Sequence, residues 1–174
     1  NINDVRALLM NDRELEKEVA AVNLEILNKE YKLYSPPENS QYVQALHKLE
    51  DQNSTSLDYK IHISNSEAVN ALYIGNGNIV LFRGLLQKLD RGDQVAAVIA
   101  HEMGHGMNNH IVKSIRSNIG SKVVKEAMHE AGVGINIRNF GVYFLKNGFS
   151  REQEEEADIE SLKLLKRAHY NPQA

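Results

Sequence analysis

The chain has 174 residues, a formal net charge of −3, 42% hydrophobic residues and no cysteine, so we expect residues 1–174 to form one domain with a substantial core. The slightly acidic balance excludes the basic surface of a nucleic-acid-binding protein, and the lack of cysteine excludes disulfides and thiolate metal sites. No apolar run reaches the length of a membrane span.

The hydrophobic pattern predicts helices around a few short strands. An amphipathic helix is expected over 3–33 and ends at Ser35-Pro36-Pro37. Apolar and polar residues alternate from Leu57 to Ser64, which indicates a half-buried strand. The other predicted elements are a helix over 40–50, strands over 70–74 and 78–82 with a turn at Gly75-Asn76-Gly77, and helices over 83–89, 93–115, 121–131 and 150–168. Residues 132–149 have no clear pattern, and the fold class is α+β, mostly helical with a small antiparallel sheet.

One motif lies inside the predicted helix 93–115. His101-Glu102-Met103-Gly104-His105 follows a run that is apolar on every side, so ionisable side chains here need a partner. Residues i and i+4 share a helix face, so His101 and His105 can bind one zinc ion. Glu102 is turned by about 100°, where a general base for a zinc-bound water belongs. The alternative is a chance match on a core helix.

Catalytic zinc usually has three protein ligands, so a third ligand is needed. A histidine at position 111 would complete one known spacing, but the chain has Ile111 there. His110 is turned by about 180° from His101 on a continuous helix. We therefore expect His110 at the surface or in a layer behind the ligands.

The better candidate lies in the acidic run at the start of the predicted helix 150–168. Ser150 and Gln153 form a capping-box pattern. On a helical wheel Glu154 falls in the centre of the apolar stripe, and a buried carboxylate is usually paired or metal-bound. Glu156 falls on the solvated face, and the alternative reading is that the whole run only favours the helix start.

Asp158 lies one turn beyond Glu154 on the same stripe. Metal-binding histidines usually donate their second ring N–H to a carboxylate or carbonyl. We therefore expect Asp158 to orient His101 or His105. The alternative is a salt bridge to a neighbouring arginine or lysine.

The motif at 101–105 and the segment S-R-E-Q-E-E-E-A-D at 150–158 together resemble a family of zinc metallopeptidases. This family includes the CaaX prenyl proteases, HtpX, and the Oma-type and BepA/LoiP-type quality-control proteases. Further similar segments are Asn70–Tyr73, Gly75–Phe82, Gly84–Leu86 and Leu164–Pro172. The resemblance covers 70–111 and 148–174.

The resemblance implies a zincin-like domain of the gluzincin type, with its sheet packed on the helix of the motif and a catalytic core over about 57–170. It implies one Zn²⁺ per chain, with His101, His105 and Glu154 as ligands, Glu102 as the base and Asp158 behind a histidine. The segment Asn70, Ala71, Leu72 and Tyr73 resembles the edge strand that binds extended peptides. Asn70 could instead be a turn residue at the strand start.

We therefore expect a zinc endopeptidase that cleaves unfolded or extended polypeptides in protein quality control; the alternative is a zinc-bound binding or chaperone-like module without turnover. His129 or Tyr143 could stabilise the transition state, although a structural role is the simpler reading of each, and His62 should face solvent. The chain starts without methionine and Asn171-Pro172 resembles a helix start, so we expect truncation at both ends. A removed N-terminal anchor would allow membrane association and an extracytoplasmic location.

Overall fold

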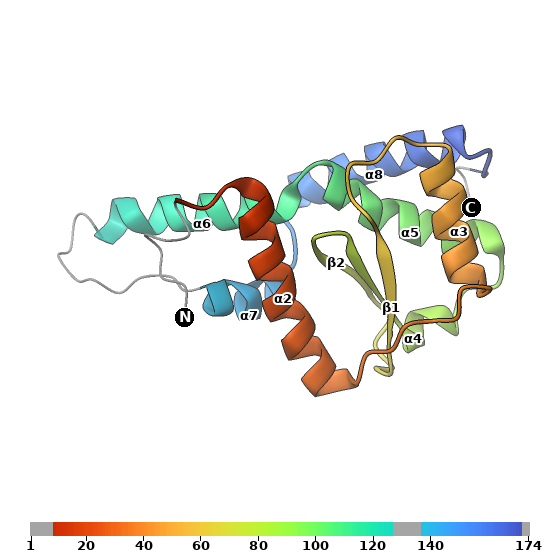
Figure 1. Cartoon of the computed structure of the whole chain (residues 1–174), viewed down its shortest axis with the longest axis horizontal. Coiled ribbons are helices and arrows are strands. Elements are labelled where there is room, and N and C mark those ends of the chain that lie inside the picture. Colours follow the sequence, from red (N-terminus) through yellow and green to blue (C-terminus); the bar gives the residue numbers. More distant parts are fainter. Residues whose placement is uncertain (1–8, 127–136, 172–174) are drawn as a thin grey trace.

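A small mixed sheet lies among the helices of the molecule (Figure 1). The computed structural model describes residues 9–126 and 137–171, and within these the sheet has three strands in the order β1-β3-β2. β1 (Lys60–Ser64) runs parallel to β3 (Asn78–Phe82), whereas β2 (Ala71–Gly75) is antiparallel to it. The predicted antiparallel sheet is therefore wrong for the β1–β3 pair. Alternation along β1 indicates which side chains are buried but not the direction of the neighbouring strand, and the tight turn determines only the β2–β3 pair.

Helices surround the sheet on both faces. In chain order they are α2 (Asp12–Tyr31), α3 (Gln41–Asp51), α4 (Arg83–Leu86), α5 (Gly92–Met107), α6 (His110–Glu126), α7 (Ile137–Asn147) and α8 (Arg151–Arg167). The central strand β3 is buried along its whole length. Its residues Ile79 and Leu81 belong to the core around α5, whereas Val80 and Phe82 belong to a second core with Leu27 of α2. Coverage on both faces explains why this strand is apolar at nearly every position.

The predicted helix 3–33 is interrupted at Met10 and Asn11, which follow the helical Leu9. α2 begins at Asp12, because the side chain of Asn11 accepts a hydrogen bond from the Glu14 amide at 2.9 Å and Glu14 bonds back to the Asn11 amide. Residues 3–8 of the predicted helix lie outside the described residues. At the other end, Lys32 has a left-handed φ of 52° and stops the helix.

The predicted helix 93–115 is in fact two helices. α5 ends at Met107 and α6 begins at His110, and between them Asn109 has a left-handed φ of 55°, a conformation that asparagine tolerates better than most residues. The side chain of Asn108 donates to the carbonyl of Gly104 at 2.8 Å. The chain therefore changes direction at Asn108-Asn109, and His110 does not continue the wheel of α5.

Two further segments complete the comparison with the predicted elements. The predicted helix 121–131 is part of α6 as far as Glu126, and its remainder lies outside the described residues. The patternless segment 132–149 contains α7. The predicted start of α8 is confirmed: Ser150 and Gln153 bond reciprocally in a capping box.

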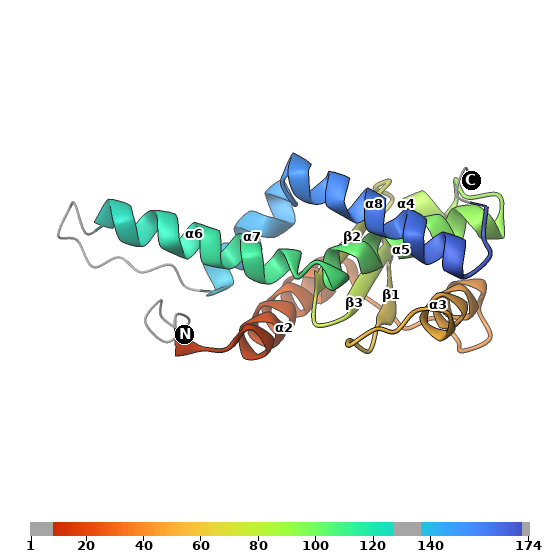
Figure 2. The ribbon, with the colours of Figure 1, turned by 90° about the horizontal axis from the view of Figure 1, so that it is seen from above.

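α5 and α8 lie side by side in both views of the ribbon (Figures 1 and 2). The contact is close at Gly104, where an added Cβ would lie 2.7 Å from the carbonyl oxygen and 3.0 Å from the Cα of Ala157. Only glycine leaves room for the backbone of α8 at this point. Because Glu154 and Asp158 flank Ala157, this contact also determines how closely those carboxylates approach α5.

A buried carboxylate attaches β2 to α2. Glu16 is 6% exposed, and its Oε1 accepts hydrogen bonds from the Tyr73 hydroxyl at 2.5 Å and from the Asn76 amide at 2.9 Å. Burial and the nearby Glu16 carboxylate raise the pKa of Tyr73, so it stays a neutral donor. These bonds fix the strand that lies beside the α5 motif.

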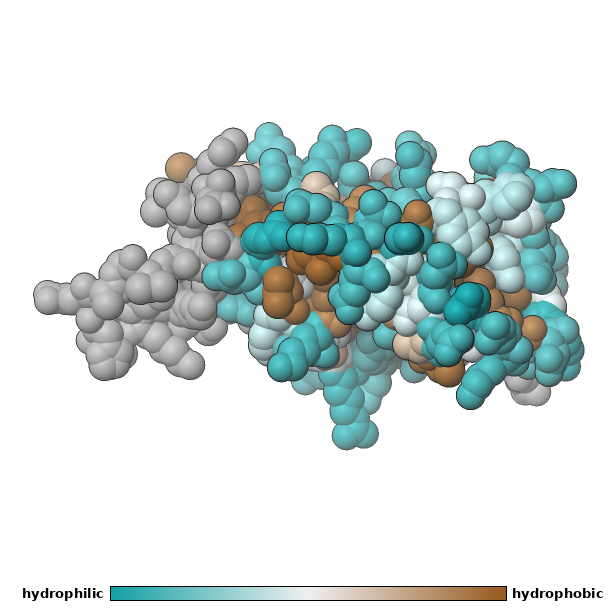
Figure 3. Space-filling model, turned by 90° about the horizontal axis from the view of Figure 1, so that it is seen from below, coloured by the Kyte–Doolittle hydropathy of each residue, from teal (hydrophilic) through white to brown (hydrophobic). Residues whose placement is uncertain are grey.

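The face seen from below has a mixed, mostly hydrophilic surface. Hydrophilic residues surround smaller apolar areas on that face (Figure 3), as on most proteins. None of the described helices combines the length and the hydropathy that a membrane crossing requires.

Replacing Gly104 with alanine should separate α5 from α8. The gain in helix propensity is about 1 kcal/mol, but overpacking against a backbone typically costs about 1–3 kcal/mol, so we expect a net loss of unfolding free energy in urea denaturation of the metal-free protein. Gly92→Ala is the matched control, because nothing lies within 4 Å of its added Cβ. Equal stability of the two variants would contradict close α5–α8 packing.

Candidate metal centre

His101 and His105 lie one turn apart on α5 with their rings 5.0 Å apart. Both direct Nε2 toward the carboxylate of Glu154: His101 Nε2 is 2.8 Å from Oε2, and His105 Nε2 is 3.4 Å from Oε1. Glu154 reaches this position because it lies in the first turn of α8, directly before the close contact at Ala157. Two segments that are far apart in the sequence thus converge on one point.

The donor set of this cluster fits a zinc ion. One ligand atom from each of His101, His105 and Glu154 lies within 4.8 Å of the others. Two imidazole nitrogens and one carboxylate oxygen are a common ligand set of catalytic zinc, which keeps a fourth position for water. The Glu154 side chain is about half exposed (46%), so the cluster opens toward solvent, whereas His105 is buried.

The charges around the two histidines also suit a cation. Burial, followed by the neighbouring imidazoles, lowers the pKa of His105 to about 3, so this ring is neutral, the form that binds metals. Burial works in the same direction on His101, but the carboxylates of Glu102, Glu154 and Asp158 outweigh it and raise the pKa of His101. Positive charge is therefore favoured on the side of the cluster that faces the carboxylates.

Asp158 lies behind His101. Its Oδ1 is 2.8 Å from His101 Nδ1, while His101 Nε2 faces Glu154. With the proton on Nδ1, His101 donates to Asp158 and keeps a lone pair on Nε2. This is the arrangement by which outer carboxylates usually orient metal-binding histidines.

Glu102 is a buried carboxylate beside the cluster, with 6% of its surface exposed. Burial raises its pKa to about 7, and the nearby Glu154 acts in the same direction, while His101 and a hydrogen bond from the Tyr73 amide partly oppose the shift. A carboxyl group with a pKa near neutral pH can both accept and release a proton.

Three residues around His105 were not predicted to contact this histidine. Of the two positions expected for His110, the structure has the layer behind the ligands: the residue is fully buried, and its Nδ1 lies 2.9 Å from His105 Nδ1. Its Nε2 lies 3.1 Å from Oε2 of Glu156, whose side chain is half exposed, as the wheel predicted. Phe149 stacks on His105, with ring centroids 3.9 Å apart and 13° between the planes. The signal that could have placed His110 is the Asn108-Asn109 pair, since asparagine favours helix ends.

A pocket of about 230 Å³ connects the cluster with the edge of the sheet. Its lining combines residues of β2, α5, α8 and the end of α7, namely Asn70, Ala71, Leu72, Glu102, His105, Phe144, Leu145, Lys146, Asn147, Gly148, Phe149 and Glu154. Three of the four predicted substrate residues therefore face the cluster. The fourth, Tyr73, has a buried side chain.

The free edge of β2 adjoins this pocket. Within the described sheet β2 pairs only with β3, and the Phe82 amide donates to the carbonyl of Asn70 at 3.1 Å. Because pairing alternates along an antiparallel ladder, the main-chain groups of Ala71 and Tyr73 point to the free edge. The Asn70 side chain accepts from the Ala71 amide at 2.9 Å, and Glu102 accepts from the Tyr73 amide.

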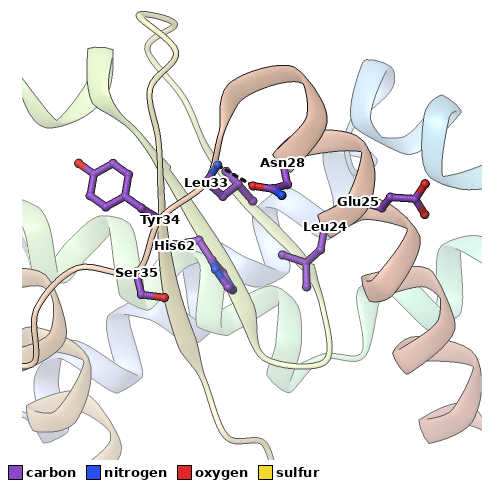
Figure 4. Close-up of a pocket in the computed structure, with 7 residues that line it drawn as sticks. All are labelled: Leu24, Glu25, Asn28, Leu33, Tyr34, Ser35 and His62. Carbon is purple, nitrogen blue, oxygen red and sulfur yellow. Dashed lines mark hydrogen bonds between the residues drawn. The ribbon is translucent and has the colours of Figure 1, made fainter.

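The other histidines and the tyrosine considered in the sequence analysis are not part of the metal cluster within the described residues. His62 is half-buried, bonds to Asn78 at 2.8 Å and lines a surface hollow of about 360 Å³ between α2 and β1 (Figure 4). Tyr143 is 56% exposed on α7, where the pocket lining comes from the residues that follow it. His129 lies outside the described residues.

Comparisons with known proteins find metalloproteases among the relatives of this chain. The chain is 32% identical over 116 residues to the mitochondrial metalloendopeptidase OMA1 of Arabidopsis thaliana, covering 67% of this chain and 24% of that protein. It is 32% identical over 147 residues to the metalloprotease LoiP of Escherichia coli, covering 78% and 57%. The chain thus spans between a quarter and three fifths of the length of these relatives.

The fold is also similar to that of a solved structure. The crystal structure of Ste24p from S. mikatae matches 98% of this chain and 49% of that chain with a TM-score of 0.58 at 21% identity. Residues 37–174, which include both halves of the metal cluster, match the family described as Peptidase family M48. The chain therefore belongs to Peptidase family M48, a family of zinc-dependent metalloproteases.

Proposed function

We propose that this chain is a zinc-dependent endopeptidase of the gluzincin type, with one zinc ion held by His101, His105 and Glu154. The observation that carries the proposal is the convergence of these three side chains beside a buried Glu102 with a raised pKa. We further infer that residues 1–174 act as one domain with a zincin-like arrangement, supported by the contacts of α5 with β2 and β3.

The reaction would be hydrolysis of a peptide bond at the pocket next to β2. A bound zinc ion would polarise the scissile carbonyl and activate a water molecule. Glu102 would take the proton from the attacking water and deliver it to the leaving amine. Asp158 would hold His101 in the tautomer that leaves Nε2 free.

We infer that the substrate binds as an extended strand along β2. The Ala71 amide and the carbonyls of Ala71 and Tyr73 face the free edge, while the Tyr73 amide donates to Glu102. Pairing with these main-chain groups would be largely independent of substrate sequence. Asn70 would hold the Ala71 amide until a substrate carbonyl replaces its side chain. A folded surface cannot supply such a strand, so unfolded or extended polypeptides are the proposed substrates.

A role in protein quality control outside the cytoplasm is also part of the proposal. One relative, 26% identical over 156 residues, is named the β-barrel assembly-enhancing protease of Escherichia coli. Membrane β-barrels belong to the bacterial outer membrane, so this name supports an extracytoplasmic location.

The first test of the proposal measures zinc. We expect one zinc per chain in the wild type and strongly weakened binding in Glu154→Gln, because an amide is a much poorer ligand than a carboxylate. Glu155→Gln is the control, since this exposed neighbour pairs with Arg151 instead. Metal analysis and competition with a chelator measure both variants. Full zinc occupancy of Glu154→Gln would contradict the ligand assignment.

The second test separates an enzyme from a binding module. Glu102→Gln should fold normally, keep its zinc and still bind unfolded casein, but its cleavage should fall by about 10²–10⁴-fold or more, since general acid–base catalysis is lost. Cleavage of casein by the wild type should also stop when a chelator is added. Wild type and Glu102→Gln cleaving at equal rates would show that Glu102 is not the base. Binding without cleavage by either would favour the binding module.

The third test concerns the β2 edge. Ala71→Pro removes an N–H that points away from β3, so the sheet should tolerate it as edge strands tolerate proline. One lost hydrogen bond is worth about 0.5–1.5 kcal/mol, and we expect kcat/KM for an extended peptide to fall by about 10-fold with zinc content unchanged. N-methylation of the peptide main chain should cause a similar loss. Unchanged kinetics in both experiments would exclude this edge as the binding site.

A further inference from the structure

We propose that His110 and Glu156 are positioning residues that fix the tautomer and orientation of His105 through a series of two hydrogen bonds, which starts at the buried His105 ring and ends at the exposed face of α8. The inference rests on the proposed function, because it takes His105 as a metal ligand. It goes further by assigning a role to two residues that neither the motif at 101–105 nor Glu154 includes.

The hydrogen-bond geometry gives this series a direction. His105 Nε2 faces Glu154 and needs a free lone pair to bind a metal, so the proton of a neutral His105 must be on Nδ1. His105 Nδ1 lies 2.9 Å from His110 Nδ1, which must then be the acceptor. A neutral His110 consequently carries its proton on Nε2, where Oε2 of Glu156 lies 3.1 Å away and accepts it. Each ring nitrogen and the carboxylate thus has one consistent partner.

Several separate contacts in the fold hold His105, His110 and Glu156 in this hydrogen-bonded arrangement. The left-handed Asn109 separates α6 from α5, and His110 at the start of α6 lies next to His105. Gln153 of α8 donates to the carbonyl of His110 at 3.3 Å and to Ser114 Oγ at 3.0 Å, which joins the start of α6 to the start of α8. Glu156 follows Gln153 by one turn of α8 and therefore lies over the His110 ring.

These two hydrogen bonds also satisfy the buried Nδ1–H of His105. His101 reaches a carboxylate, Asp158, directly. His105 is almost fully buried, and Phe149 stacks on its ring, so its Nδ1–H would be costly without an acceptor. His110 supplies this acceptor and transmits the charge of Glu156 from the half-exposed surface of α8. The two ligand histidines are thus both oriented from α8, one directly and one through an intermediate ring.

The competing explanation is that His110 is a core residue whose hydrogen bonds merely satisfy a buried ring. Both explanations predict a loss of stability when His110 is removed. They differ on zinc affinity in the folded protein and on the position of the His105 proton, so these two quantities are the readouts.

The experiment compares two replacements of His110. Asn places a carbonyl oxygen near the position of the histidine Nδ1 and can accept from His105, whereas Leu has a similar size and no acceptor. We expect His110→Leu to weaken zinc binding by about 10–100-fold, the usual effect of an outer-shell partner, and His110→Asn to recover most of it. Competition with a chelator measures affinity, and circular dichroism confirms that each zinc-free variant is folded.

Variants of α8 test the far end of this series without disturbing the core. Glu156→Ala should weaken zinc binding, and Glu156→Gln, which keeps an acceptor, should weaken it less. Glu155→Ala is the matched control and should bind as the wild type does. In the zinc-loaded wild type, ¹⁵N-resolved NMR of the imidazole rings should show the His105 proton on Nδ1 and the His110 proton on Nε2.

The outcomes separate the two proposals. If the wild type binds no zinc, or if His105→Ala binds it unchanged, the proposed function fails and the positioning role fails with it. If the wild type binds one zinc through His105 but His110→Leu binds equally tightly, only the positioning role is overturned. A His110 proton on Nδ1 in the zinc-loaded protein would also overturn it.

Discussion

The close contact between α5 and α8 is the constraint on which the candidate site depends. His101 and His105 come from one helix, so their separation follows from helix geometry alone. Glu154 and Asp158 come from another helix, and their distance from the histidines depends on how near α8 can approach. Gly104 permits this approach because α8 presents its backbone there, 2.7 Å from an added Cβ. A glycine between the two histidines of the motif is thus a packing requirement before it is a chemical one.

The packing of α8 against α5 also provides charged partners for the buried histidines of α5. α5 is a core helix, and unpaired ionisable groups in it would be costly. The start of α8 is acidic, which the helix dipole and the Ser150 capping box favour on their own. Packing this acidic end against α5 brings Glu154 to both ligand histidines, Asp158 to the second nitrogen of His101, and Glu156 to His110, which contacts the second nitrogen of His105. Residues that stabilise a helix start therefore also balance the charges of the site.

Local patterns in the sequence were enough to place the parts of the site that lie within regular helices. The i, i+4 spacing put both histidines on one face. The apolar stripe of α8 singled out Glu154 and Asp158 from their acidic neighbours, but the burial expected for them is wrong for Asp158, whose side chain is 70% exposed, and Glu154 is half exposed. The turn at Gly75-Asn76-Gly77 and the capping box of α8 were also predicted, because each depends on a few adjacent residues. The direction of β1 relative to β3 was predicted incorrectly, because it depends on how distant segments meet.

His110 shows how far a helical wheel can be extended along a sequence. On a continuous helix it would lie opposite His101, and that wheel left two positions open, the surface and the layer behind the ligands; the structure has the second. A single left-handed residue, Asn109, restarts the helix in a new direction and brings the ring to 2.9 Å from His105. Glu156 lies on the exposed face of α8, as its own wheel predicted, and its carboxylate reaches the buried His110 ring from there. Helical periodicity therefore assigns residues to a helix face only up to the next break in the helix. A pair of asparagines after a motif is a reason to start a new helical wheel at the residue that follows them.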